Sequence, residues 1–392
     1  MIACASSAQN RPVMFVQPYG LGSSSGGSRI LSNMIREQPF AAHSVNTDPL
    51  PAPPVEGISE THLPVRPTLG RLDRSRFSKL GKCLEMAWRL SFKKRLSAHF
   101  EACDPKIVHV LPHGASDFFI AWQLARARGN RVVMSVHDDL RYTLLGHPLR
   151  QKSDLWLAKM WLDVDQVFII SEQLGQEYSR RYGRREYEII TDGVENISNI
   201  PPKRPSHRLH LYFMGLFHHA YGKNLLNLTR ALAAFKAIRP ELDLRLKMRC
   251  ASLPRKLRLE FKPEVLPFAN QHTVEDDLKN ADLLYLPLPF DEVTKNFTNY
   301  SLSTKMVSYL ASGLPILYHG PADSAAGTLL STHSAAISWN NLDPKIGQAA
   351  FSALFSSQFC EGMGKNALAL ARSSFDLKGL KAKFLKGILG QD

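Results

Sequence analysis

The sequence contains little cysteine and no apolar run of the ~18–20 residues that a helix needs to cross a bilayer. Its five cysteines are scattered and form no CxxC pair, which argues against a zinc site and against a disulfide framework. The first residues lack the basic flank and the apolar stretch of a signal peptide. We therefore expect a protein that works in the reducing cytoplasm without spanning a membrane.

Acidic residues are also few: 35 Asp and Glu stand against 49 Lys and Arg, which gives a formal net charge of +14. Such an excess suits nucleic acid, an anionic membrane surface or phosphorylated substrates. The sequence has no RNP string, zinc-finger spacing or basic zipper, so we expect no nucleic-acid partner. An anionic membrane surface and phosphorylated substrates are the partners that the charge favours.

The sequence does have the composition of a globular protein, 44% hydrophobic and 21% charged, and its length suffices for two domains. Short apolar strands alternate with helical stretches, a pattern that predicts an α/β protein with parallel sheets. A Pro-rich polar stretch interrupts the pattern, which then restarts with LHLYFMG. We predict an N-terminal domain over residues 1–196, a linker over 197–208, a C-terminal domain over 209–374 and a last helix within 375–392. Residues 47–67 are predicted to form an exposed loop.

The stretch from Asn296 to Gly320 carries the strongest local signal. A helix is expected at Thr304–Ser312, with Gly313 as its stop, Pro315 next and a buried strand from Ile316. Free N–H groups, hydroxyls and a lysine at a helix start are typical of an anion site. The alternative is an ordinary turn with a solvated lysine.

The string SLSTKMVSYLASGLPIL resembles the donor-site helix of GT-B glycosyltransferases of the family-four kind. The resemblance implies two Rossmann-like domains facing each other across a cleft, with the last helix crossing back to the first domain. It also implies sugar transfer from a nucleotide-sugar donor with retained configuration. The family's two glutamates, eight positions apart, fall on Tyr300 and Ser308, so the usual carboxylate contacts to the donor are missing.

The resemblance also assigns donor-binding residues. A lysine of the family falls near Lys223, whereas its nearby arginine is replaced by Leu216. Diphosphate neutralisation by lysine and a helix start requires no metal, so neither a metal nor a cofactor is expected. The residues predicted to bind the donor are Gly215, Lys223, Tyr300, Ser303, Thr304, Lys305 and Ser308.

Two further groups of candidates lie in the first domain. His137 ends a strand, where open α/β sheets bind ligands, and its family counterpart lies near the reacting sugar. We predict that it is catalytic; the alternative is a structural histidine. His113 and Asp138 are candidates on the acceptor side. A Gly-rich turn with Gly26, Gly27 and Arg29 is predicted to approach phosphate or acceptor, and the alternative is a surface turn.

The run Arg71–Leu96 is predicted to be a basic amphipathic helix. Its interleaved basic, aromatic and leucine residues suit an anionic bilayer surface, and the alternative is a solvated surface helix. We therefore expect a peripheral protein on the inner membrane face. The expected activity is metal-independent sugar transfer to a lipid-linked or polysaccharide acceptor in glycan biosynthesis. The alternative function is that of a catalytically impaired GT-B protein acting as a binding or scaffolding partner.

Overall fold

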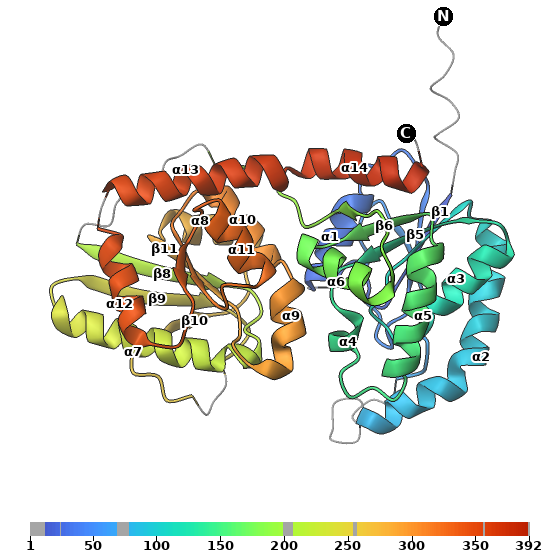
Figure 1. Cartoon of the computed structure of the whole chain (residues 1–392), viewed down its shortest axis with the longest axis horizontal. Helices are drawn as coiled ribbons and strands as arrows, with labels where there is room; N and C mark the ends of the chain where they lie inside the picture. Colours follow the sequence, from blue (N-terminus) through green and yellow to red (C-terminus); the bar gives the residue numbers. More distant parts are fainter. Residues whose placement is uncertain are drawn as a thin grey trace, which may run out of the picture. The chain divides into compact units, whose positions relative to one another are not determined.

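The computed structural model describes residues 12–23, 25–68, 78–198, 207–253, 257–355 and 357–390. The chain divides into two compact units, which are labelled by element in Figure 1. Unit 1 comprises Met1–Gly193 and Leu377–Asp392, and unit 2 comprises Val194–Asp376. Most of the predicted linker, residues 199–206, lies outside the described residues.

Unit 1 is built on a parallel seven-stranded sheet in the order β3-β2-β1-β4-β5-β6-β7. Chain order reverses between β1 and β4, and this topological switch point is where open α/β sheets bind ligands. The strands are β1 (Val13–Gln17), β2 (Ala42–Asn46), β3 (Ser59–His62), β4 (Ile107–Val110), β5 (Arg131–Val136), β6 (Gln166–Ile169) and β7 (Glu188–Ile189).

Both faces of this sheet are covered by helices. Val13 and Phe15 of β1 belong to a core cluster with residues of the first and last helices, while Met14 and Val16 are buried as well. The helices of unit 1 are α1 (Gly26–Ile35), α2 (Ser78–Cys103), α3 (Asp117–Ala127), α4 (Leu140–Thr143), α5 (Arg150–Asp163), α6 (Glu172–Tyr182) and α14 (Leu377–Leu389).

The last helix, α14, completes the core of unit 1. Its Phe384 ring lies 5.0 Å from that of Phe168 and 6.5 Å from that of Phe15. Arg131 donates hydrogen bonds to the carbonyl groups of Gly387 and Ile388. The element that follows unit 2 in the chain is therefore an integral part of unit 1.

Three local predictions for unit 1 need correction. Gly26, Gly27 and Arg29 were expected in a turn, but α1 begins at Gly26, with the Ser25 hydroxyl accepting the Ser28 N–H at its start. The expected loop 47–67 contains β3, a short polar edge strand paired with β2. Polar edge strands lack the apolar alternation from which a strand is predicted.

The third correction concerns the basic helix, which is α2 and ends later than expected, at Cys103. Its apolar side chains do not all face the core of unit 1: Phe92 is buried, whereas Leu90 is 80% exposed and Trp88 42% exposed. The inward side of α2 is formed by Phe92, Leu96 and Phe100. Residues 71–77 of the predicted helix lie outside the described part of the chain.

Unit 2 contains a parallel six-stranded sheet in the order β10-β9-β8-β11-β12-β13. Its switch point lies between β8 and β11. The strands are β8 (Arg208–Met214), β9 (Asp243–Arg249), β10 (Glu264–Leu266), β11 (Leu283–Pro287), β12 (Ile316–His319) and β13 (Ile337–Trp339).

Helices again cover both sheet faces. One core cluster joins α7 to Leu209, Leu211 and Phe213 of β8, and another joins α10 and α13 to Leu284 and Leu286 of β11. The helices are α7 (Gly222–Ile238), α8 (Gln271–Lys279), α9 (Lys295–Tyr300), α10 (Thr304–Ser312), α11 (Ala325–Thr332), α12 (Pro344–Ala353) and α13 (Ser357–Ser374), with short 3-10 turns at His219–Tyr221 and Glu292–Thr294.

The prediction around α10 is confirmed in detail. The helix has the predicted bounds and ends at Gly313, whose φ of 70° is the left-handed conformation that glycine adopts without strain. Strand β12 follows from Ile316. The α/β class and the two Rossmann-like units are likewise confirmed, while their facing across a cleft stays a prediction. None of the described helices is both long and apolar enough to cross a membrane.

Candidate functional site

The first cluster lies at the switch point of unit 2. Gly215 follows β8 with a φ of 97°, and a side chain at this position would come within 3.4 Å of the Lys305 side chain. The Lys305 ammonium lies 5.3 Å from the ring centroid of Phe213 and 5.5 Å from that of Tyr221. Tyr309 of α10 accepts the Met214 N–H, which fixes α10 against the end of β8. The fold thus brings together Gly215 and Lys305, two of the residues that were predicted to bind the donor.

Lys305 is a partly buried cation without a carboxylate partner. Within the described ranges no Asp or Glu forms an ion pair with it, and burial lowers its pKa to about 8. The aromatic rings beside it stabilise the ammonium through their negative faces but carry no counter-charge. A partly buried ammonium with no counter-charge is suited to accept an anion.

The start of α10 adds hydrogen-bond donors to this charge. Ser303 occupies the cap position, but its hydroxyl does not cap the helix. The N–H groups of Thr304 and Lys305 make no hydrogen bond within the described part of the chain. The first turn therefore presents N–H groups, a hydroxyl and an ammonium, a combination suited to phosphate.

The other predicted donor residues of unit 2 lie in different settings. Lys223, near the start of α7, is 62% exposed and pairs with Asp291, with Nζ and Oδ1 2.5 Å apart. Ser308 donates a long hydrogen bond of 3.4 Å to the Thr304 carbonyl, one turn back. Tyr300 ends α9. Tyr300 and Ser308, which occupy the positions of the family's two glutamates, both carry hydroxyl groups.

The second cluster lies at the carboxyl ends of β1, β4 and β5 in unit 1. The Tyr19 hydroxyl is 3.2 Å from Nδ1 of His137, and the Tyr19 ring lies edge-on to that of His113 at a centroid distance of 6.1 Å. Nδ1 of His113 is 3.9 Å from the Asp138 carboxylate. The structure thus brings together His137, His113 and Asp138, and it adds Tyr19, which the sequence analysis missed.

Burial sets the protonation of this second cluster. It lowers the pKa of His137 to about 3, with the neighbouring His113 as the lesser cause. Burial raises the pKa of Tyr19 well above its usual range, and the Asp138 charge acts in the same direction. His137 is therefore a neutral imidazole at neutral pH and Tyr19 a protonated phenol.

Arg29 does not join that cluster, because its guanidinium pairs with the buried carboxylate of Asp192, with Nε and Oδ2 3.0 Å apart. Burial raises the pKa of Asp192 to about 6 against the opposing effect of Arg29. Gly27 does approach the cluster, since a side chain there would lie 2.7 Å from the Tyr19 hydroxyl. Of the predicted glycine turn, Gly27 thus contacts the histidine cluster, whereas Arg29 stabilises a buried acid.

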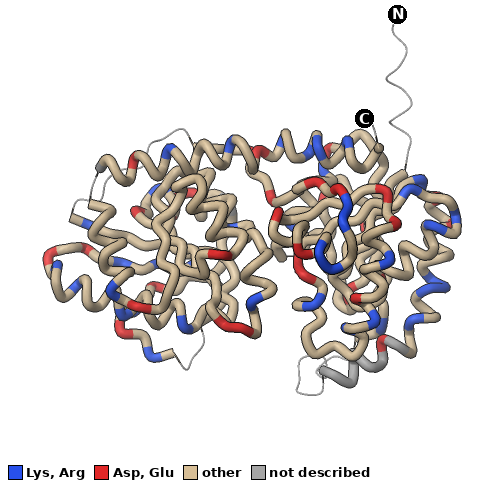
Figure 2. Tube along the Cα trace, in the orientation of Figure 1, with Lys and Arg blue, Asp and Glu red and all other residues tan. Residues whose placement is uncertain are grey.

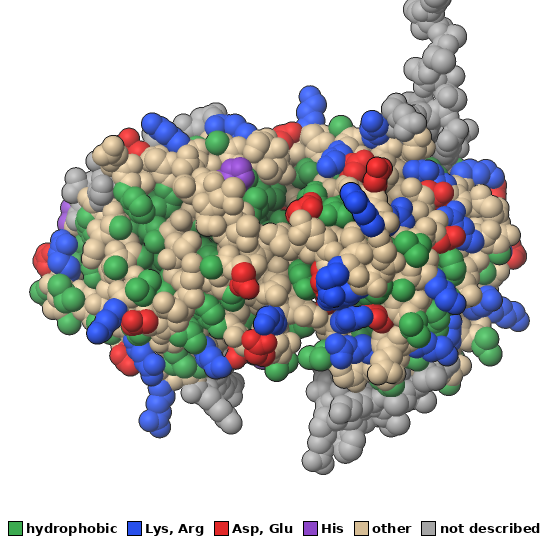
Figure 3. Space-filling model, viewed as in Figure 1, with side chains coloured by type: hydrophobic (Ala, Val, Ile, Leu, Met, Phe, Trp, Pro, Cys, Tyr) green, Lys and Arg blue, Asp and Glu red, His purple; other side chains and the backbone are tan. Residues whose placement is uncertain are grey.

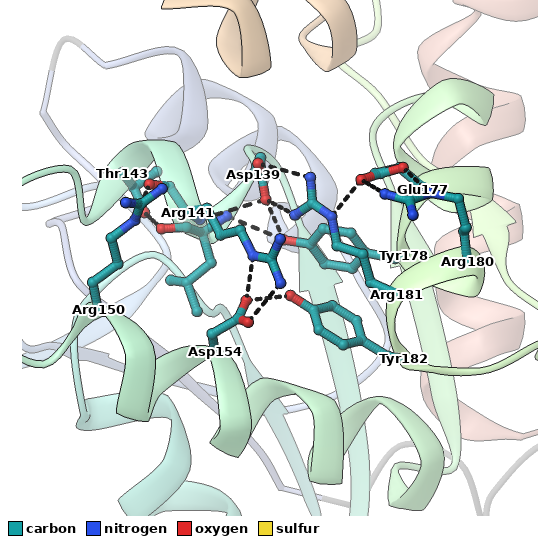
Figure 4. Close-up of polar contacts among 11 residues, drawn as sticks. Asp139, Arg141, Thr143, Arg150, Asp154, Glu177, Tyr178, Arg180, Arg181 and Tyr182 are labelled. Carbon is teal, nitrogen blue, oxygen red and sulfur yellow. Dashed lines mark hydrogen bonds and ion pairs between the residues drawn. The ribbon is translucent and has the colours of Figure 1, made fainter. Parts of the chain in front are cut away.

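A network of polar side chains anchors the segment that follows His137 (Figure 4). Asp139 caps α4 and forms a buried ion pair with Arg181 of α6, with Nη1 and Oδ1 2.7 Å apart. Arg141 contacts both carboxylate oxygens of Asp154 on α5, at 2.8 and 2.9 Å. These contacts tie the loop after β5 to two helices, so His137 and Asp138 are placed by a well-anchored backbone.

Asp163 and Asp165 of unit 1 have the Asp-x-Asp spacing that could place two carboxylates on one metal ion. Both carboxylates pair with Arg126, at 2.7 and 2.8 Å. This arginine offsets one of their two negative charges. The expectation of metal-free chemistry stays a prediction.

Comparison with known proteins bears on the fold. Residues 46–196 match the family model of Glycosyltransferase Family 4. The structure is similar to sucrose-phosphate synthase from Thermosynechococcus elongatus, with a TM-score of 0.67, 13% identity and coverage of 97% of this chain and 98% of that chain. The chain therefore has the GT-B fold, and the match to family four covers residues 46–196. The resemblance to GT-B glycosyltransferases of the family-four kind is thereby confirmed, while the donor-site role of residues 301–317 stays a prediction.

Two other solved structures are similar to this GT-B protein over almost its whole length. One is HepE from Anabaena in complex with UDP and glucose, with a TM-score of 0.67, 12% identity and coverage of 97% of this chain and 99% of that chain. The other is WaaG, a glycosyltransferase involved in lipopolysaccharide biosynthesis, with a TM-score of 0.65, 14% identity and coverage of 96% and 100%. No curated protein matches the sequence. At these identities the likeness establishes the fold, and the roles of individual residues stay predictions.

Proposed function

We propose that this GT-B protein transfers a sugar from a nucleotide-sugar donor to a lipid-linked or polysaccharide acceptor in glycan biosynthesis. The observation that carries the proposal is Lys305, a partly buried ammonium without a carboxylate partner, at the switch point of unit 2. Partial removal of such a charge from water is unfavourable, and a bound anion offsets that cost. The diphosphate of a nucleotide-sugar supplies that anion, and it is also the group whose departure must be stabilised.

The donor diphosphate contacts Lys305 and the N–H groups at the start of α10. Gly215 suits this place because its φ of 97° would strain any other residue. Lys223 adds a second positive charge by exchanging Asp291 for the phosphate. That exchange is energetically accessible, since an exposed ion pair contributes only about 0–1 kcal/mol.

His137 supports transfer on the side of unit 1 as a neutral hydrogen-bonding group. Its pKa of about 3 keeps it from carrying a charge at neutral pH. His113 and Asp138 take part on the acceptor side. The reaction requires no metal in this proposal, so transfer is expected to continue unchanged in the presence of a chelator.

A catalytically impaired binding protein is the competing candidate, because Tyr300 and Ser308 stand where the family has glutamates. Both candidates bind a nucleotide-sugar, but only the enzyme releases the nucleoside diphosphate. Measurement of binding therefore tests the donor site, and measurement of release separates the two functions.

The donor site is tested by a panel of nucleotide-sugars screened for a thermal shift, followed by titration of the best donor. Replacing Lys305 by Ala removes a charge-assisted contact worth about 1.5–3 kcal/mol, so affinity should fall by roughly 10- to 150-fold. Lys345→Ala is the matched control, because Lys345 is an exposed lysine in the first turn of another helix of unit 2, α12. Unchanged affinity in Lys305→Ala would show that the donor binds elsewhere.

Peripheral membrane binding is part of the proposal and is supported by α2. Leu90 is exposed on this helix one turn before exposed Lys93 and Lys94, and Trp88 is exposed elsewhere on it. Figure 2 shows the basic positions along α2, and Figure 3 shows Lys and Arg side chains gathered over unit 1. Apolar side chains beside lysines suit an anionic bilayer surface, where each charge contributes up to about 1 kcal/mol.

Vesicle co-sedimentation tests this surface. Binding to anionic but not neutral vesicles is expected, with loss at high salt as the Debye length shrinks from about 10 Å at 0.1 M to about 3 Å at 1 M. The variant Lys93→Glu/Lys94→Glu should bind less, whereas Lys345→Glu/Lys365→Glu in unit 2 changes the net charge equally and should not. Arg95 is left intact because it donates a hydrogen bond to the Pro64 carbonyl. Equal sedimentation with both vesicle types, or equal losses in both variants, would refute the assignment to α2.

A further inference from the structure

Tyr19 forms a contact that the proposed function does not yet use. It follows β1, and its hydroxyl meets Nδ1 of His137, which follows β5 and lies 118 residues later in the sequence. The donor of this hydrogen bond depends on which imidazole nitrogen carries the proton. The direction of the bond therefore decides what His137 presents on its other nitrogen, Nε2.

Both groups of this pair are uncharged at neutral pH. The phenol retains its proton because burial and the Asp138 charge raise its pKa. The imidazole stays neutral because burial and His113 lower its pKa to about 3. A neutral imidazole carries one N–H and one acceptor nitrogen, and the phenol can donate only if Nδ1 is the acceptor.

The first turn of α1 favours donation by Tyr19. A side chain at Gly27 would lie 2.7 Å from the Tyr19 oxygen, so the backbone at the start of this helix is close to the phenol. The start of a helix is its positive end, which attracts the oxygen lone pairs and repels the hydroxyl hydrogen. The hydrogen then points toward the other close polar atom, Nδ1 of His137.

A second tyrosine–histidine hydrogen bond occurs in unit 2, and there the contacts determine which group donates. The Tyr285 hydroxyl lies 2.9 Å from Nδ1 of His319, and Nε2 of that histidine lies 2.9 Å from the Asn341 carbonyl. A carbonyl only accepts, so Nε2 of His319 carries the proton and Tyr285 donates to Nδ1. This pair provides an internal reference for the direction inferred at His137.

Nε2 of His137 differs from that reference in having no protein partner. Within the described part of the chain Nε2 makes no hydrogen bond. The fully enclosed polar atoms without a partner do not include it, so it is not sealed inside the protein. It is therefore open to a ligand, although only 8% of the residue is exposed. An open N–H at the switch point of a parallel sheet is placed to meet a substrate.

We propose that Tyr19 is a positioning residue that holds His137 in the tautomer with the proton on Nε2, so that Nε2 donates a hydrogen bond to an oxygen of the sugar substrate. The catalytic half of this statement rests on the proposed glycosyltransferase function. The structural half, a phenol donating to Nδ1, does not depend on it.

The structural half is tested by ¹⁵N NMR of the full chain labelled at histidine, at neutral pH. The spectrum of His137→Gln identifies the His137 signals by their absence, and His319 provides the reference for an Nε2–H tautomer. In the wild-type protein, His137 should show an unprotonated Nδ1 and a protonated Nε2. In Tyr19→Phe, which keeps the ring but removes the donor, the Nδ1 signal should shift toward that of a free imidazole. A protonated Nδ1 in the wild-type protein overturns the proposal even if the variant does not fold.

The catalytic half is tested by steady-state transfer with the donor that binds. Tyr19→Phe should lower kcat roughly tenfold, the effect expected on losing a partner that orients a reacting group, and should leave KM for the donor nearly unchanged. Tyr187→Phe is the matched control, since it removes a hydroxyl that bonds Glu172 at the surface of the same unit. An unchanged kcat in Tyr19→Phe overturns the positioning role. Absence of transfer in the wild-type protein defeats the proposed function, while the NMR result still decides the tautomer.

Discussion

At the scale of single residues, the two clusters differ in how much of them the sequence could predict. Lys305 was predicted to bind the donor because it lies at a helix start, and a helix start is recognisable from a few neighbouring residues. Tyr19 was missed because its partner lies 118 residues away and no short-range pattern records the contact. Asp192 was missed for the same reason, since it meets Arg29 only through the folded sheet.

The lowered pKa of Lys305 predicts a pH dependence for donor binding. Protonated lysine binds the diphosphate, and in the free protein this proton is lost as pH rises through about 8. Binding of an anion raises the lysine pKa, so affinity should be constant below pH 7 and should fall by up to about tenfold per unit above pH 8.

Titration calorimetry at pH 7, 8 and 9 checks this expectation. The diphosphate of a nucleotide-sugar is fully ionised over that range, so the donor's phosphates add no slope. The same titrations with Lys305→Ala should show weaker binding with little pH dependence. A wild-type affinity that stays flat from pH 7 to pH 9 would contradict the role of Lys305.

At the scale of elements, the loop after β5 depends on neighbouring arginines in opposite settings on α6. The Arg181 side chain is 6% exposed and pairs with fully buried Asp139, while the Arg180 side chain is 72% exposed and pairs with Glu177. Arg181→Met leaves a buried carboxylate without its partner and should lower the free energy of unfolding by about 3–5 kcal/mol. Arg180→Met should change it by less than about 0.5 kcal/mol.

Urea denaturation of both variants provides the measurement. Comparable shifts in the two midpoints would mean that the Asp139 pair does not anchor this loop. Because the loop carries His137 and Asp138, a destabilised Arg181 variant that still folds should also lose transfer activity.

Helix α14 is the other element whose role is testable. Phe384 is buried among Phe15, Phe168 and His109, so Phe384→Ala should destabilise unit 1 by about 3–5 kcal/mol. Lys386→Ala, at an exposed position of the same helix, is the control. Hydrogen exchange should show protection lost in β1 and β6 of unit 1 but kept in β8 and β11 of unit 2. Loss of protection confined to unit 2 would contradict the assignment of α14 to unit 1.

Element prediction from the sequence succeeded where a pattern was strong. Helix α10 was placed with correct bounds because a polar start, an apolar face and a glycine stop coincide. Strand β3 was missed because SETH is short and polar, and only its pairing with β2 makes it a strand. The exposure of Leu90 on α2 was also not predictable, because the side of a long helix that packs is decided by its tertiary neighbours.

At the scale of the whole molecule, the repeated strand–helix pattern predicted both parallel sheets. What it could not give is the order of strands, since β1 lies between β2 and β4 in space. That order creates a switch point in each unit, and the two candidate clusters lie at those points. The placement of Lys305 in one unit and His137 in the other is therefore a consequence of topology.

The central claim is that this GT-B protein is an active glycosyltransferase, although the family's two glutamates are replaced by Tyr300 and Ser308. Release of nucleoside diphosphate by the purified full chain, measured with the nucleotide-sugar that binds and with a glycolipid acceptor extract, tests it most directly. We predict steady release that the acceptor stimulates, that Lys305→Ala strongly reduces and that Lys345→Ala leaves unchanged. Tight donor binding with no release above the uncatalysed rate, with or without acceptor, would contradict the claim and identify a binding protein instead.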